Sequence, residues 1–251
     1  LQVLRALHRF GWLRTRDLAA LLWQRWASEP AGEPNLVPAE PTAAGLRMAQ
    51  RTLRRLREMR QVLDARAPDG SVIYALAEAG VRGLQAAGIT AISGKNLMRN
   101  FSSAHFRHRC IANEIAIGAI VQGFRVSVER ETAQGRWLGG ERGIAGKVPD
   151  VLMRSRDHVW WVEVERSRKN AGEYARLLRW LGEVGCDAFN ATPSKLLGGS
   201  LRWGKVVFVC TPAFQDKLRR DLAKAGWKRG HFETLIVFST ALYRFEDIIF
   251  R

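Results

Sequence analysis

The stretch that decides the fold of this chain is KVPDVLMRSRDHVWWVEVERSRK, from Lys147 to Lys169. Its two apolar segments, VPDVLMRS and HVWWVEVERS, are typical of neighbouring β-strands joined through a turn near RSRDH. In the second segment, strand alternation places Trp161, Glu163 and Glu165 on one face and the intervening valines on the other. Carboxylates on a central strand are costly unless a cation or hydrogen-bond donors meet them. The stretch therefore predicts either a functional site or glutamates that pair with arginines at a sheet edge.

A third carboxylate belongs to the same pattern. Asp150 follows Pro149 at the start of the first segment, 13 positions before Glu163. If the two strands pair through the turn, Asp150 and Glu163 come close together. Three converging oxygen donors are how a Mg²⁺ site is usually built, with water and a substrate phosphate completing it.

The surrounding sequence predicts a mixed sheet with helices packed on its faces. Apolar periodicity indicates a helix at 102–124 whose buried sides include Ile111, Ile115 and Ile120, followed by a strand at 125–132 and a glycine-rich turn at 135–146. After the two central strands come segments with the periods of a helix, a strand, a helix and a strand. They span 171–185, 205–211, 213–227 and 234–240.

The formal charge of +16 at pH 7 is spread over the whole chain of 251 residues. Residues 1–98 carry a net +6 and residues 99–251 a net +10. A folded protein of this charge most often binds nucleic acid through counterion release; a general bias toward arginine is the alternative. We expect a reduced, cytoplasmic protein. Its three cysteines are scattered along the sequence, and we find no signal peptide and no apolar run that could cross a bilayer.

The first hundred residues have the element order of a winged helix. LQVLRALHRFG and TRDLAALLWQRW read as helices, and a loop over 28–43 with four prolines follows. The next predicted helix spans 42–66 and buries Leu46, Leu53, Leu56 and Leu63. VLDARAPDGSVIYAL then reads as a β-hairpin around PDG. In a winged helix-turn-helix the last helix enters the major groove of DNA.

Four arginines make the third helix the candidate DNA-reading element. Arg47, Arg51, Arg54 and Arg55 recur at spacings that place them on one helix face. They could contact phosphates or guanine edges. A solvated basic face on a helical bundle is the alternative. The segment ITAISGKN reads as a linker, so we expect domains at 1–92 and 99–251 with a boundary near 92–98.

Two resemblances follow from these residues. The pattern of PD followed by EVE resembles the metal-binding signature of the PD-(D/E)xK nuclease superfamily. A winged helix followed by VPDVLM and WVEVERSRK is similar, more narrowly, to the replication-relaxation proteins of plasmids and integrative elements, which include MobC-type relaxases. The resemblance implies an α/β (α+β) fold: an N-terminal winged helix-turn-helix, then a restriction-endonuclease-like mixed sheet with flanking helices.

The resemblance also implies roles for particular residues. Asp150 and Glu163 would hold Mg²⁺ or Mn²⁺, with the carbonyl of Val164 as a further ligand, and Glu114 would be an additional catalytic acid. Glu165 stands where the superfamily usually has lysine, and would act as a base or bind a second metal. Arg166, Arg168 or Lys169 could supply the missing positive charge, and Arg166 and Lys169 are also expected to contact DNA.

The function implied is a DNA-binding protein of a plasmid or integrative element, acting at a transfer or replication origin. It would nick DNA by metal-dependent phosphodiester hydrolysis. Its expected partners are double-stranded DNA, single-stranded DNA at the nick and other relaxosome proteins. The alternatives are a non-catalytic relaxosome accessory protein, a replication initiator or a transcriptional regulator with a pseudo-nuclease domain. Tyr174 is the tyrosine to consider as a covalent nucleophile.

Overall fold

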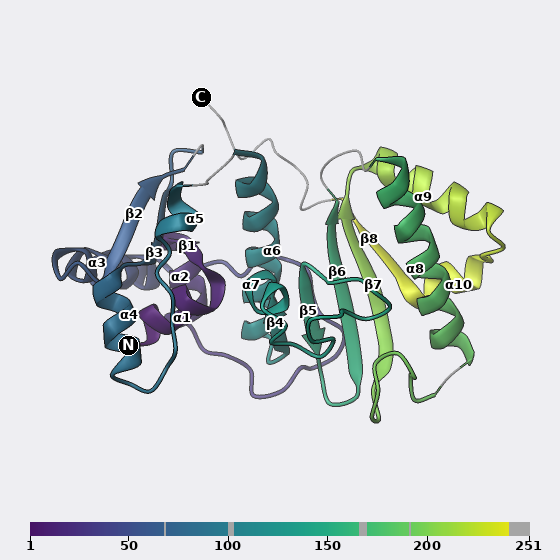
Figure 1. Cartoon of the computed structure of the whole chain (residues 1–251), viewed down its shortest axis with the longest axis horizontal. Helices are drawn as coiled ribbons and strands as arrows, with labels where there is room; N and C mark the ends of the chain where they lie inside the picture. The colour runs from purple at the N-terminus through teal and green to yellow at the C-terminus, as the bar shows by residue number, and fades with distance from the viewer. Residues whose placement is uncertain (68, 100–102, 166–169, 191, 241–251) are drawn as a thin grey trace. The chain divides into compact units, whose positions relative to one another are not determined.

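A computed structural model describes residues 1–67, 69–99, 103–165, 170–190 and 192–240. Over these residues the chain has a mixed α/β fold with ten helices, a three-stranded antiparallel sheet and a five-stranded mixed sheet (Figure 1). The chain divides into two compact units. The first holds Leu1–Ser28 and Asn35–Gly123, and the second holds Glu29–Pro34 and the described residues from Phe124 onward.

The first unit contains the three expected helices, the expected hairpin and a short strand that the sequence did not predict. Its strands form an antiparallel sheet in the order β1-β3-β2, with Leu13 opposite Tyr74 and Ala65 opposite Ile73. Its elements are α1 (Gln2–Phe10), β1 (Trp12–Arg14), α2 (Thr15–Leu22), α3 (Ala43–Glu58), β2 (Val62–Arg66), β3 (Val72–Leu76), α4 (Glu78–Gln85), α5 (Lys95–Arg99) and α6 (Ser103–Val121). Residues 23–42 form a loop without helix or strand. This loop was expected over 28–43, and it begins earlier because α2 ends at Leu22 and not at Trp26.

Helix α3 is shorter than the sequence predicts. It begins after Thr42, whose hydroxyl accepts a hydrogen bond from the Gly45 amide at 3.0 Å, and it ends at Glu58. Arg60 adopts the left-handed conformation at φ 53°, which turns the chain out of the helix. The expectation that Leu63 lies on the buried side of this helix was therefore wrong, because Leu63 is part of β2 and pairs with Ala75.

The second unit has the predicted alternation of strands and helices. Its five strands lie in the order β4-β5-β6-β7-β8, with β4, β5 and β6 antiparallel and β7 and β8 parallel to β6. Two short helices, α7 and α10, were not predicted. The elements are β4 (Arg125–Val128), α7 (Glu129–Ala133), β5 (Val151–Arg154), β6 (His158–Glu165), α8 (Ala171–Asn190), β7 (Arg202–Cys210), α9 (Pro212–Lys224), α10 (Arg229–Leu235) and β8 (Ile236–Ser239).

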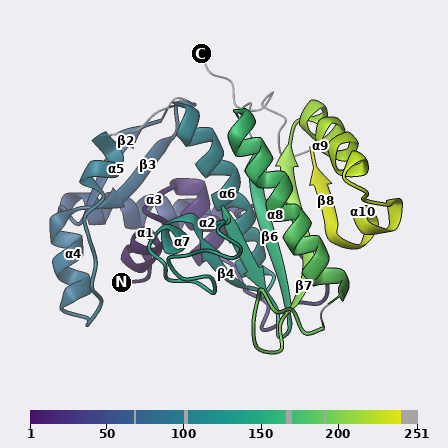
Figure 2. The same cartoon turned by 45° about the vertical axis from the view of Figure 1, so that its right-hand side comes forward.

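Strand β6 is buried on both faces, which a central strand between parallel and antiparallel neighbours requires. On one face Trp161 packs against Trp180 of α8, with ring centroids 4.7 Å apart. On the other face the ring of Trp160 meets Phe124 edge-on at 5.2 Å. Helix α8 runs along the sheet in Figure 2, and its buried residues join one continuous apolar core with those of β6 and β7.

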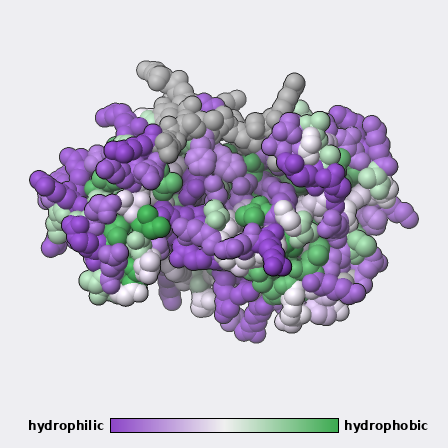
Figure 3. Space-filling model, viewed as in Figure 1, coloured by the Kyte–Doolittle hydropathy of each residue, from purple (hydrophilic) through white to green (hydrophobic). Residues whose placement is uncertain are grey.

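The face drawn in Figure 3 is mostly hydrophilic, with small separate hydrophobic areas. Among the described residues, none of the helices combines the length and apolar character needed to cross a membrane.

Helix α6 belongs to the first unit, whereas the sequence assigned it to the second. It covers one face of the small sheet: Phe106 stacks on Trp12 with ring centroids 5.5 Å apart, and Cys110 packs into the same cluster with Ile73 and Ala75. Without α6 these apolar side chains would face water. The division between the units consequently falls after Gly123, and the expected boundary at 92–98 lies inside the first unit.

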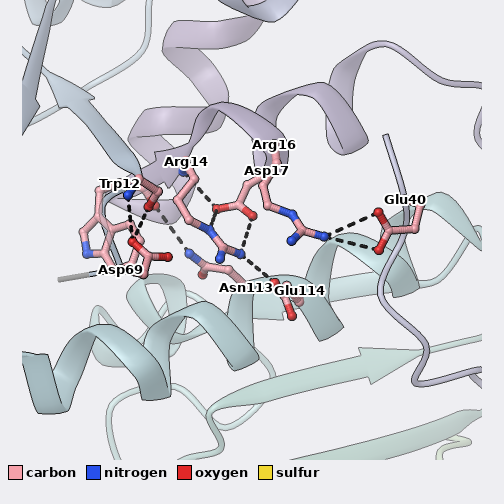
Figure 4. A network of polar contacts seen from close by, with 9 residues as sticks. Trp12, Arg14, Arg16, Asp17, Glu40, Asp69, Asn113 and Glu114 are labelled. Carbon is pink, nitrogen blue, oxygen red and sulfur yellow. Dashed lines mark hydrogen bonds and ion pairs between the residues drawn. The ribbon is translucent and has the colours of Figure 1, made fainter. Parts of the chain in front are cut away.

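Polar side chains of α6 also bind successive residues around β1. Arg109 donates to the Phe10 carbonyl at 2.6 Å, and Asn113 donates to the Trp12 carbonyl at 3.4 Å. Glu114 accepts from the guanidinium of Arg14 at 2.7 Å (Figure 4). Phe10 ends α1, whereas Trp12 and Arg14 lie in β1. The three positions are two residues apart, so α6 holds one side of this segment.

Arg14 is the buried centre of this network. Its guanidinium and backbone amide donate to the carboxylate oxygens of Asp17 at 2.8 to 3.0 Å. By accepting from the Arg14 amide, the Asp17 side chain also caps the first turn of α2. Burial by itself would lower the pKa of Arg14, but the charges of Asp17 and Glu114 outweigh it and raise the pKa. Arg14 and Asp17 are only 4% and 3% exposed, so neither charge can be replaced by water contacts.

Replacing Arg14 with Met is expected to destabilise the protein by about 3–5 kcal/mol, because Asp17 would be left as a buried, unpaired charge. The matched control is Arg16→Met, which removes the neighbouring surface pair between Arg16 and Glu40 (Figure 4). That change should cost less than about 1 kcal/mol. Urea unfolding followed by circular dichroism measures both. Equal losses in the two variants would contradict a structural role for the Arg14 network.

Candidate carboxylate site

Strand pairing brings Asp150 and Glu163 together, as the sequence predicted. In the antiparallel pair of β5 and β6, Val151 lies opposite Val162. The Asp150 amide extends the ladder by donating to the Val162 carbonyl at 3.1 Å. The Asp150 carboxylate in turn accepts the backbone N–H of Val164 at 2.7 Å. One oxygen of Asp150 therefore acts as a backbone acceptor for β6.

Glu163 is buried and hydrogen-bonded through both of its carboxylate oxygens. It is 4% exposed, on the strand face that packs against α8. Its Oε2 lies 2.5 Å from Nζ of Lys147, and its Oε1 accepts the indole N–H of Trp161 at 2.5 Å. The ion pair and the indole together satisfy a charge that could not otherwise remain in this core.

A tight turn delivers Lys147 to this position. Ile144 and Lys147 exchange backbone hydrogen bonds of 2.9 and 3.2 Å across Ala145 and Gly146, which have φ values of 51° and 74°. Two consecutive positive φ values identify a type I′ turn. The buried Ile144 carbonyl accepts the indole N–H of Trp180 at 2.9 Å, so the turn is fastened to α8.

The three carboxylates influence one another electrostatically. Burial raises the pKa of Glu163 from 4.5 to about 7, and the ammonium of Lys147 opposes that rise. The negative charges of Asp150 and Glu165 also contribute to this rise, and the value of about 7 is the net result of all four influences. Asp150 and Glu165 therefore both lie within electrostatic range of Glu163.

Glu165 lies at the end of β6, where it is 5% exposed and stands opposite Cys210 of the parallel strand β7. Burial and the charge of Glu165 together raise the pKa of the Cys210 thiol to about 12. Cys210 is consequently a neutral thiol at physiological pH.

The donor set does not fit a metal centre in this arrangement. Both oxygens of Glu163 already accept short hydrogen bonds from Lys147 and Trp161, and one oxygen of Asp150 accepts from Val164. In the part of the chain that the structure describes, no three His, Cys, Asp or Glu side chains are placed so that they could hold a metal ion. Binding of Mg²⁺ or Mn²⁺ by Asp150 and Glu163 stays a prediction of the resemblance alone.

The other predicted site residues lie elsewhere. Glu114 is ion-paired with Arg14 in the first unit, a structural role that its place in the sequence did not reveal. Arg166, Arg168 and Lys169 lie outside the described residues. Arg47, Arg51, Arg54 and Arg55 are exposed on α3 of the first unit.

Lys147 is the residue that sequence reasoning missed. It lies three positions before Asp150, in a glycine-rich segment read only as a turn. The available signal was a lysine two positions before Pro149, but nothing local indicated that the turn would direct it toward β6.

Tyr174 is unsuited to nucleophilic attack. Burial and a hydrogen bond from its hydroxyl to Asp221, of 2.9 Å, raise the pKa of Tyr174. The ammonium of Lys217 lies 3.3 Å from the centre of its ring, and Lys217 also binds Asp221 at 2.7 Å. Tyr174 thus helps to join α8 to α9.

Comparisons with protein-family models, with curated proteins and with solved structures found no match for this chain.

Replacing Lys147 with Met is expected to destabilise the protein by about 3 kcal/mol at pH 8, because Glu163 would be left buried without its cation. The folded-state pKa of Glu163 lies above its ordinary value of 4.5 and would rise further without Lys147. Ionised Glu163 is then more costly in the folded chain than in the unfolded chain, so the loss should grow from pH 5 to pH 8. Urea unfolding at both pH values measures it.

The control is Lys224→Met, which removes an exposed lysine of α9 whose nearest carboxylate oxygen, in Asp221, is 4.0 Å away. That variant should stay within about 0.5 kcal/mol of the unmodified protein at both pH values. A loss in Lys147→Met that is the same at pH 5 and pH 8 would contradict the assigned ion pair.

Proposed function

We propose that this chain is a duplex DNA-binding protein whose first unit reads the DNA. The element order α1-β1-α2-α3-β2-β3, with the sheet order β1-β3-β2, is that of a winged helix-turn-helix. In that fold the third helix enters the major groove and the hairpin lies beside it. Here the third helix is α3, the hairpin is formed by β2 and β3, and the tip of the hairpin carries the turn around Gly70.

The observation that carries the proposal is the arginine face of α3, formed by Arg47, Arg51, Arg54 and Arg55. All four side chains are exposed, and none forms an ion pair with another residue that the structure describes. Buried Ala49, Leu53 and Leu56 fix the opposite side of the helix against the unit, so the arginines cannot turn inward. A row of uncompensated cations on a firmly packed helix is suited to phosphates and to guanine edges.

A second group of cations extends this surface. Arg57, Arg60, Arg82 and Lys95 line a cavity of about 500 Å³ whose apolar part includes Val62 and Ala77. Glu78 lines the same cavity, but among the described residues only Arg57 of these four forms an ion pair, with Asp64 at 3.6 Å. Because Arg57 lies in the last turn of α3 and Arg60 comes just after the helix, a DNA strand leaving α3 would meet these cations next.

The element order of the second unit supports a nuclease-like fold, but its carboxylates are not arranged to catalyse hydrolysis. In this unit the antiparallel strands β4, β5 and β6 are followed by α8 and then by β7 parallel to β6, which resembles the PD-(D/E)xK core after its first helix. The helix that precedes β4 in the chain, α6, belongs to the first unit. The carboxylates lie at the positions that the resemblance implies, but their oxygens are bonded within the chain. We therefore favour the non-catalytic form of the function, in which this unit assists at a DNA site that the first unit selects.

The resemblance to replication-relaxation proteins suggests where such a protein acts. A transfer or replication origin of a mobile element offers a duplex site, single-stranded DNA after nicking and other relaxosome proteins as partners. A transcriptional regulator would use the same first unit. A palindromic footprint at a promoter, rather than a footprint at an origin, would favour the regulator.

Replacing Arg51 and Arg54 with Gln is expected to weaken binding to DNA from around the gene for this chain. The slope of log Kd against log salt should fall by about 1 for each phosphate contact that is lost. The matched control is Arg229→Gln, which removes an arginine of α10 whose side chain is 92% exposed. Fluorescence anisotropy with a labelled duplex at several salt concentrations measures the slopes. An unchanged slope in the α3 variant would count against α3 as the DNA-binding element.

Supercoiled plasmid carrying the same DNA is expected to be bound without being relaxed, in Mg²⁺, in Mn²⁺ and in EDTA alike. The reason is that the ligand oxygens of Glu163 are already occupied by Lys147 and Trp161. Agarose gels of the plasmid after incubation give the readout. Relaxation that needs a divalent metal and disappears in Glu163→Gln would instead identify the protein as a nicking enzyme.

A further inference from the structure

The cavity at the end of α3 is lined as a binding site for an anion would be. Its four cations come from three separate parts of the chain: Arg57 and Arg60 from the end of α3 and the turn after it, Arg82 from α4, and Lys95 from the start of α5. One carboxylate, Glu78, lines it as well, so the lining is positive on balance. Like charges that converge on one space repel one another until an anion enters between them.

The rest of the lining is apolar, which narrows the class of anion. Val62 and Ala77 are buried in the wall of the cavity, and Leu63 and Ala79 are half-buried beside them. A sugar phosphate would press its hydroxyl groups against these side chains without hydrogen-bond partners, at a cost. A nucleobase has an apolar face and can also stack on a guanidinium. The volume of about 500 Å³ lies within the usual range of small-molecule sites.

We propose that this cavity binds a nucleoside phosphate, with the phosphate groups among the cations and the base against the apolar wall. Arg60, Arg82 and Lys95 form no ion pair with any residue that the structure describes, so their charges are available to phosphate oxygens. Arg57 has a loose contact with Asp64, at 3.6 Å, between side chains that are 63% and 35% exposed.

A bound nucleotide should also weaken DNA binding. It would occupy the cations of Arg57 and Arg60, which a DNA strand leaving α3 would otherwise meet. This consequence rests on the proposed function, whereas binding of the nucleotide itself does not.

Close packing at two glycines fixes the walls of the cavity. The Gln61 carbonyl accepts the Ala77 amide at 3.1 Å, and a Cβ atom on Gly80 would come within 2.2 Å of the same oxygen, so α4 packs directly on the chain that leaves α3. Gly94 donates to the Leu76 carbonyl at 2.8 Å, and a Cβ atom there would come within 2.5 Å of a side chain of β3. The cavity is therefore formed before a ligand arrives, which lowers the cost of binding.

Isothermal titration calorimetry of the full chain without DNA tests the site. The probes are the diphosphates of adenosine, guanosine, cytidine and uridine, with inorganic pyrophosphate for comparison. At least one nucleoside diphosphate should bind more tightly than pyrophosphate by about tenfold or more. Replacing Arg60 and Lys95 together with Gln should weaken that binding by about tenfold or more, since both side chains are exposed and removing them leaves the apolar wall intact. Arg229→Gln, which removes an exposed arginine of α10, should leave it unchanged.

A second variant, Ser93→Phe, fills the cavity and keeps all four cations. It should weaken binding of the nucleoside diphosphate and leave binding of pyrophosphate unchanged. In fluorescence anisotropy with the labelled duplex, a saturating concentration of the nucleotide should raise the Kd of the unmodified protein for DNA by about fivefold or more. The Kd of Ser93→Phe for DNA should not respond to the nucleotide.

Two results would overturn the proposed site. One is that no nucleoside diphosphate binds more tightly than pyrophosphate. The other is undiminished nucleotide binding by the Arg60 and Lys95 variant, with its fold verified by circular dichroism. Nucleotide binding that leaves the Kd for DNA unchanged would overturn the competition with DNA. Because the calorimetry contains no DNA, the proposed function and the nucleotide site can fail separately.

Discussion

The first unit depends on one requirement, that the buried guanidinium of Arg14 must meet carboxylates. Asp17 supplies one from the next turn of the chain, and Glu114 supplies the other from 100 positions away. Since leaving a buried charge unpaired costs several kcal/mol, α6 and the small sheet are favoured only in each other's presence. The stacking of Phe106 on Trp12 adds apolar contact at the same junction. A short strand is thereby made stable by a helix that lies far away in sequence.

The second unit meets the same requirement with the charges reversed. Its central strand carries buried Glu163, and the compensating Lys147 comes from a turn outside the strand pattern. In both units the strand places a charged group in the core, and a segment remote from that strand neutralises it. Such a pair adds little net stability, because the attraction between its charges roughly equals the cost of removing both from water. Its main effect is on specificity, since alternative folds would leave one charge buried and unpaired.

Local pattern was sufficient to predict the closeness of Asp150 and Glu163, because two adjacent strands and one turn decide it. It was also sufficient for the arginine face of α3, which depends only on helical spacing. It failed for β1, since three residues carry no periodic signal. It predicted the helix α6 but not the unit to which α6 belongs, because the polar partners of α6 lie about 100 positions earlier. Lys147 was missed for the same reason, because its direction is set by Trp180 on α8. Long-range contacts, which composition and spacing do not encode, account for these differences.

The inclusion of α6 in the first unit changes which part of the chain can be regarded as a module. A fragment that stopped at residue 98 would lose Phe106 and Cys110, and Trp12, Ile73 and Ala75 would become an exposed apolar sheet face inclined to self-associate. A fragment that continues to Gly123 keeps that face covered and keeps Arg14 paired. Recombination could therefore exchange α1 to β3 intact only together with this helix, so the smallest heritable piece of the first unit extends to Gly123.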